Sequence, residues 1–215
     1  MTPARPENLI DMLARNLQPV TPMATPWKRA LGWLAVVTLV ALPATYFLGD
    51  MTHLASRYSG REPMMLFEIL AMSATAIFAT LAAFAASVPG RSARWRLVPV
   101  APFMVWLLLS GAGCVDDLAN PSTSGWALSF HCLGFILATS TALAFPLIWA
   151  LSRARPIDAL PVALLGGLAS AAISALLLQF FHPFAVTILD LAVHVAAIGL
   201  VVGIAALFRR TLRPA

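Results

Sequence analysis

Six long apolar runs occupy most of this chain of 215 residues and leave no room for a separate soluble enzyme domain. A helix needs about 20 mostly apolar residues to cross a bilayer. The charged fraction is only 11%, against about 25% in an ordinary soluble domain. The sequence therefore predicts an all-α polytopic membrane bundle of six transmembrane helices, preceded by a short amphipathic helix. The runs are Ala30–Leu48, Met64–Val88, Leu97–Ala112, Ala127–Leu151, Leu160–Phe181 and Pro183–Phe208.

The positive charges are distributed unevenly between the two sides of these runs. All but Arg57 and Arg61 of the 14 Lys and Arg residues fall in the N-terminal arm, the second and fourth loops, and the C-terminal tail. Cytoplasmic loops of membrane proteins carry an excess of such residues. We therefore expect both termini in the cytoplasm, with an arm at 1–29, a membrane domain at 30–208 and a basic tail at 209–215. Membrane orientation explains the basic balance, so it gives no reason to expect direct nucleic-acid binding.

The N-terminal arm contains a short amphipathic pattern. In ENLIDMLARNL, residues 7–17, one apolar stripe joins the side chains of Leu9, Ile10, Leu13 and Leu17. A proline on each side marks the two ends of this helix. Residues 18–26 are rich in proline, which predicts an extended tether. The stripe has three possible destinations: the chain's own membrane domain, the lipid surface, or a groove on a soluble partner.

Cysteine and histidine gather near the side of the membrane opposite the basic loops. Cys114, His131, Cys132 and His182 all fall there. Thiolate and imidazole suit Cu(I) and Zn, so one interpretation is metal or redox sensing. A static disulfide between Cys114 and Cys132, or two inert cysteines, are the alternatives. No cofactor is required by the sequence, and a copper or zinc ion enters only as a signal.

Two ionisable residues lie deep within the last run. Asp190 and His194 are four residues apart and share one helix face. Both should face the bundle, because exposing them to lipid is costly. They form either a local polar pair that fixes helix packing or a relay from the outer side into the bundle.

The arm and the layout together resemble a known family. The string LIDMLARNLQPV, residues 9–20, is similar to the N-terminal signature of NrsF-type anti-sigma factors, L-I-x-x-L-A-x-x-L-x-P-V, which precedes six spans and a basic end. The resemblance implies a bacterial inner-membrane protein whose arm sequesters an extracytoplasmic-function (ECF) sigma factor. Leu9, Ile10, Leu13 and Leu17 would face that partner, and a periplasmic signal would release it.

The resemblance also bears on the signal. Members of this family are linked to heavy-metal stress through two cysteines, and Cys132 matches one of them. His182 stands where the family has the other, and Cys114 is an additional thiol. A mixed Cys/His site is therefore implied rather than a simple pair of thiols. His194 matches a histidine of the family's last span.

Other functions remain open on the residues alone. Pro43 and Pro146 interrupt two runs, as in the broken helices of transporters, so a small transporter or metal-handling protein is the main alternative. A structural membrane subunit without sensing is the third hypothesis. The chain has no HExxH, GxSxG or glycine-rich phosphate loop, so we expect no catalytic activity.

Overall fold

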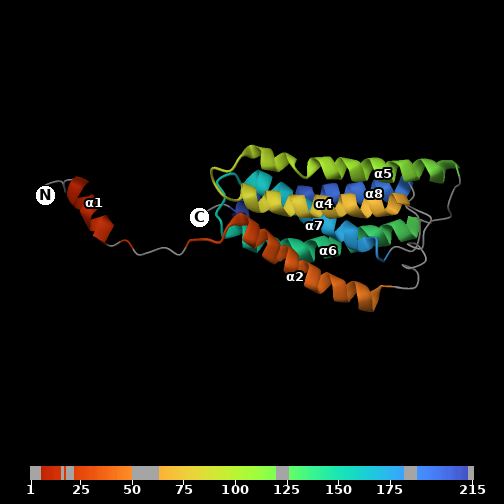
Figure 1. The fold of residues 1–215 in the computed structure, drawn as a ribbon, viewed down its shortest axis with the longest axis horizontal. Coiled ribbons are helices and arrows are strands. Elements are labelled where there is room, and N and C mark those ends of the chain that lie inside the picture. The colour runs from red at the N-terminus through yellow and green to blue at the C-terminus, as the bar shows by residue number, and fades with distance from the viewer. Residues whose placement is uncertain are drawn as a thin grey trace.

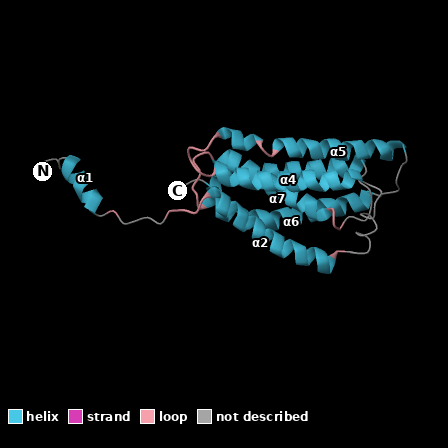
Figure 2. Cartoon of the chain, in the orientation of Figure 1, coloured by secondary structure: helices cyan, strands magenta, loops and turns pink. Residues whose placement is uncertain are grey.

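The computed structural model is all-helical wherever it describes the chain (Figure 2). It describes residues 6–15, 17, 22–49, 63–119, 126–181 and 188–212, and no side chain at 6–9, 63–64, 113–119 or 126–130. Within these ranges lie seven α-helices and two short 3₁₀ helices, η1 and η2. The α-helices are α1 (Pro6–Arg15), α2 (Pro26–Leu48), α4 (Pro63–Ala86), α5 (Val100–Ala119), α6 (Trp126–Ser152), α7 (Ala159–Leu178) and α8 (Ile188–Leu207).

Six segments, one in each of the helices from α2 to α8, are long and apolar enough to cross a membrane. Their positions match the six runs, so the predicted fold class is confirmed. The two internal prolines, Pro43 and Pro146, do not break α2 or α6, which continue through them. The broken helices expected of many transporters are therefore not found at these two positions.

The third run differs most from its prediction. A 3₁₀ turn, η1 (Ala93–Leu97), precedes Pro99, and α5 begins only at Val100. Proline disfavours the α conformation in the residue before it, which explains the delayed start. At its other end α5 continues to Ala119 rather than stopping at Ala112, because the first proline after it is Pro121. The predicted run ended before Cys114 and so placed it in the loop that follows. The structure instead places Cys114 in the last turns of α5.

Helix α7 forms the centre of the bundle. It packs against α4, α6 and α8, while α5 bridges α4 and α8. Small residues let these helices approach closely. A Cβ atom on Gly167 would lie 2.8 Å from the Cβ of Ala205 and 3.0 Å from the Cα of Val202. Gly167 therefore permits the close approach of α7 and α8.

Helix α2 joins the bundle mainly through its first turns. Only Pro26, Ala30 and Trp33 are buried along it. The guanidinium of Arg29 donates a hydrogen bond to the carbonyl of Ala150 in α6, and it lies 5.0 Å from the ring of Phe84 in α4. The N-terminal arm is thereby anchored where α2 begins.

The described positive charges gather at one end of the bundle, which we call the basic end. It is formed by the start of α2, the α4–α5 connection with η1, the α6–α7 connection, and η2 (Phe208–Leu212). Figure 1 shows α1 beyond this end, apart from the bundle, with the C-terminus nearby. The charge asymmetry in the sequence thus becomes an asymmetry in space.

Candidate functional site

Two regions place side chains in uncommon surroundings: the arm helix α1 exposes apolar side chains, and the bundle buries ionisable ones. All described side chains of α1, residues 10–15, are exposed. Ile10 is 64% exposed and Leu13 is 57% exposed. Leu9 lies in the helix, but its side chain is outside the described residues. The apolar stripe is therefore not covered by the chain's own bundle, which was one of its three possible destinations.

The arm helix is shorter than predicted. It ends at Arg15 rather than Leu17, although the N–H of Leu17 still donates a hydrogen bond to the carbonyl of Ala14. Helix ends differ by one or two residues between definitions, and this last bond continues the turn. Leu17 is 78% exposed, and Met12, which the stripe did not include, is 54% exposed. Met12 is an exposed apolar neighbour that the pattern missed.

The second region is a polar cluster inside the bundle, toward the end opposite the basic one. Asp190 is fully buried on α8, and His194 is only 6% exposed. Both side chains therefore lie inside the bundle, as their shared helix face predicts. The bundle also buries a carboxyl and an amide side chain that were not part of the predicted site, Glu68 on α4 and Gln179 just after α7.

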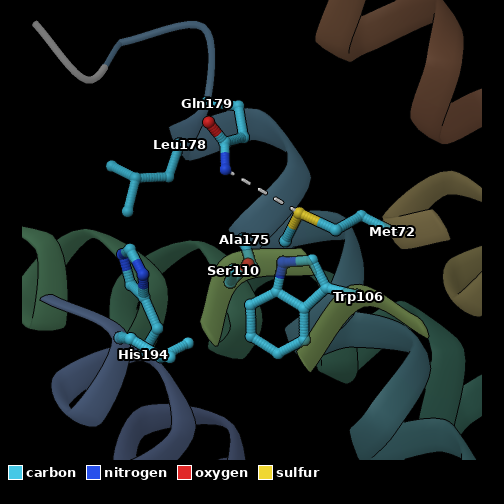
Figure 3. Close-up of a pocket in the computed structure, with 8 residues that line it drawn as sticks. Met72, Trp106, Ser110, Ala175, Leu178, Gln179 and His194 are labelled. Carbon is cyan, nitrogen blue, oxygen red and sulfur yellow. Dashed lines mark hydrogen bonds between the residues drawn. The ribbon is translucent and has the colours of Figure 1, made fainter. Parts of the chain in front are cut away.

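A small cavity adjoins this polar cluster. Met72, Trp106, Ser110, Gln179 and His194 contribute to its lining (Figure 3). The amide nitrogen of Gln179 donates to the sulfur of Met72 at 4.0 Å, which links α4 to the end of α7. The cavity has room for about one water molecule. It brings side chains from four elements together, which a pattern along one helix cannot reveal.

Cys132 lies close to the same cluster. It is 6% exposed, forms no disulfide among the described side chains, and packs with Ile136, Leu178 and Ala197. Leu178 also lines the small cavity, so Cys132 packs against a residue of the cavity wall. His131, its neighbour in the chain, is exposed. Adjacent residues on a helix point in different directions, and here one faces inward while the other does not.

The remaining predicted ligands lie outside the described side chains. Cys114 belongs to the last turns of α5 without a described side chain, and His182 is not described at all. Among the side chains that are described, no three of His, Cys, Asp or Glu form a group able to hold a metal ion. Metal or disulfide chemistry at Cys114, Cys132, His131 and His182 therefore stays a prediction.

The fold and these two regions define a class: polytopic helical bundles of membrane type that carry an amphipathic helix outside the bundle. Comparison with protein families places the chain within that class. The family described as "Negative regulator of sigma F", NrsF, matches residues 13–213, and the chain belongs to it. The predicted family is thereby confirmed. No curated protein and no solved structure matches the chain.

The extent of the match divides the arm. It includes Leu13 and Leu17, the whole bundle and the basic end, whereas Leu9 and Ile10 precede it. The family description names a sigma factor as the regulated partner, so the chain is a relative of negative regulators of transcription.

Proposed function

We propose that this chain is a membrane-bound anti-sigma factor that binds an ECF sigma factor through α1 and acts without catalysis. It lies in a bacterial inner membrane with both termini in the cytoplasm. The arm holds the sigma factor away from RNA polymerase, and a periplasmic metal or redox signal acting on the bundle releases it.

The exposed apolar face of α1 is the observation that carries this proposal. Apolar surface gains free energy when it leaves water, and a short amphipathic helix commonly docks in a groove of a partner. A helix that lies on lipid prefers several Lys or Arg residues on its polar face, whereas α1 has only Arg15. A protein partner at the basic end fits this face better than the lipid surface does.

A binding experiment with the full-length chain tests the proposal. The protein is reconstituted into nanodiscs and exposed to lysate or to each purified sigma factor of the source bacterium. The double variant Leu13→Asp/Leu17→Asp places two carboxylates on the stripe. Anchor residues of an interface each contribute about 2 kcal/mol or more, so we expect affinity to fall at least about 100-fold.

Ile157→Asp is the matched control. Ile157 is 81% exposed in the α6–α7 connection at the same end of the bundle, and it lies outside α1. This variant should bind like the natural chain. Equal binding by the stripe variant and the natural chain would contradict the proposal, as would the absence of any bound sigma factor.

The signal is the second part of the proposal. The polar cluster around Asp190 and His194, with Cys132 beside it, supports a site that senses chemistry on the periplasmic side. Cys132→Ala keeps a small apolar side chain and removes the thiol. In nanodiscs, Cu, Zn or an oxidant should release the bound sigma factor from the natural chain and not from this variant, with Mg²⁺ as the inactive control ion. Release from both proteins would assign the signal elsewhere.

The same buried cluster favours one alternative, a small transporter or metal-handling protein. Ionisable residues inside membrane helices often mark an ion pathway. In that case His194→Leu abolishes metal uptake or export, while deletion of α1 has no effect on it. Under the proposed function the dependence is the reverse.

A further inference from the structure

A wide apolar groove lies on the outside of the bundle between α6 and α8, and its lining shares no residue with that of the polar cavity. Its volume is about 500 Å³, within the range of roughly 300–1,000 Å³ that is typical of ligand sites. Phe145, Ile148 and Trp149 of α6 form part of one wall, and Val201 and Ile204 of α8 form part of the other. The groove runs toward the basic end, where Phe208 and Thr211 of η2 also line it.

The mouth of the groove at the basic end is positively charged. The guanidinium of Arg153 stacks on the ring of Trp149, with 3.7 Å between its central carbon and the ring centroid. Arg209 and Arg210 lie in η2, between the two η2 residues that line the groove, and both are exposed. The walls are therefore apolar along the bilayer and cationic at its surface.

A second cation adds to this positive potential. Arg29 bonds to the carbonyl of Ala150, three residues before Arg153 at the same end of α6, so the two like charges lie at one corner of the bundle. One nitrogen of Arg29, Nη1, is buried and has no hydrogen-bond partner among the described residues. The ion pair at the same end of the bundle joins Arg96 to Asp158 and involves neither arginine. An anion beside Arg153 would relieve the repulsion.

From this combination we propose that the α6–α8 groove and Arg153 form a binding site for an anionic phospholipid of the leaflet at the basic end. The acyl chains lie along the groove, and the phosphate headgroup lies at Arg153 with η2 beside it. Basic pockets between membrane helices bind such headgroups, and each nearby arginine strengthens binding roughly fivefold. Charge complementarity favours this occupant over a second copy, whose basic end carries the same charges. The inference rests on the membrane placement and not on sigma-factor binding.

The site lies next to the anchor of the arm. Arg29 bonds to the carbonyl of Ala150, which is one position after the groove residue Trp149. A bound headgroup would therefore hold the end of α6 against the start of α2. Lipid bound in the groove would therefore stabilise the start of α2, from which the arm with α1 extends.

The test measures lipid binding to the full-length chain, purified and delipidated in detergent. Native mass spectrometry counts bound lipid, and thermal unfolding measures stabilisation, with phosphatidylglycerol, phosphatidylcholine and inorganic phosphate as separate probes. We expect phosphatidylglycerol to bind and to raise the unfolding temperature. Phosphatidylcholine and free phosphate should have little effect.

Two variants locate the site. Arg153→Gln should weaken phosphatidylglycerol binding roughly fivefold, and Ala144→Phe should fill part of the groove and displace the lipid. The matched controls are Arg91→Gln, in the α4–α5 connection, and Ala35→Phe, on the exposed face of α2. Both controls should bind lipid like the natural chain.

Three results would overturn the proposal. One is equal binding of phosphatidylglycerol and phosphatidylcholine. Another is unchanged phosphatidylglycerol binding by both Arg153→Gln and Ala144→Phe. The third is a dimer that occupies the groove in place of lipid and that Ala144→Phe dissociates. If a variant fails to fold, the natural chain alone still tests the proposal. Preferential binding of phosphatidylglycerol supports it, and equal binding of the two lipids overturns it.

Discussion

The arm helix α1 and the last bundle helix α8 depart from the usual placement of side chains in opposite ways. α1 leaves Ile10 and Leu13 exposed, whereas α8 buries Asp190 and His194. An exposed apolar stripe does not stabilise a monomer, and an ionisable residue inside a membrane helix is costly. Each departure is therefore a candidate for a role beyond folding. Under the proposed function, α1 acts on a sigma factor outside the chain and α8 acts inside the bundle.

The largest expected effect comes from removing the arm altogether. Deletion of residues 1–20 should leave the bundle in the membrane, because the described side chains of α1 are all exposed. Transcription by the partner sigma factor should rise to its fully induced level without any signal. A reporter gene measures this, and an immunoblot of the membrane fraction checks the protein level.

The opposite outcome is informative as well. Unchanged transcription with normal protein in the membrane would show that α1 does not hold the sigma factor. Only the buried residues of α8 would then still indicate a role beyond folding, and the transporter alternative would be strengthened.

A second prediction concerns the packing that holds α8 in place. Gly167→Leu places a large side chain where the Cβ alone would already lie 3.0 Å from the Cα of Val202. Overpacking of this kind costs about 1–3 kcal/mol, so the unfolding temperature in detergent should fall clearly. Gly203→Leu is the matched control, because a Cβ on Gly203 meets nothing within 4 Å.

The two glycine variants also separate stability from partner binding. Binding of the sigma factor to the folded fraction of Gly167→Leu should be unchanged, since α1 lies apart from the α7–α8 contact. Equal stability of the two variants would mean that α7 and α8 pack less closely than the structure shows.

The sequence predicts the fold well because each membrane span is a local feature. About 20 apolar residues suffice to identify a span, and each of the six runs corresponds to a helix. The main errors in the predicted bounds concern the start and the end of α5. Pro99 delays the start of α5, and the residues after Ala112, where the predicted run ended, remain helical up to Ala119.

The candidate site was predictable only where it depends on one helix. The inward face of α8 follows from the spacing of Asp190 and His194. The contact of Gln179 with Met72 joins residues 107 positions apart, and the hydrogen bond from Arg29 to Ala150 joins residues 121 apart. Such contacts arise from the packing of helices, which residue spacing within one helix does not encode.

A third prediction tests whether the buried Asp190 transmits the signal or only stabilises helix packing. Asp190→Asn preserves the size of the side chain and removes its carboxylate. If Asp190 transmits the signal, release of the sigma factor should respond several-fold less to the inducing metal or oxidant. Repression without the signal should stay normal, because α1 is unchanged. A reporter assay with and without the inducer measures both quantities.

Thermal unfolding of the same variant provides the control. A role limited to packing predicts a normal response together with a stability loss of about 1–3 kcal/mol from the disturbed buried contacts. A normal response with such a loss would therefore assign Asp190 to helix packing.

The smallest effect is expected for a carboxylate outside the membrane helices. Asp158 lies 3.1 Å from a guanidinium nitrogen of Arg96, and the two side chains are 55% and 40% exposed. Surface ion pairs contribute about 0–1 kcal/mol, because water and salt screen them. Asp158→Asn should therefore lower stability by less than about 1 kcal/mol and leave sigma-factor binding and release unchanged. An effect on release as large as that of Asp190→Asn would mean that the connection between α6 and α7 transmits the signal, and the contrast between buried and exposed carboxylates would no longer hold.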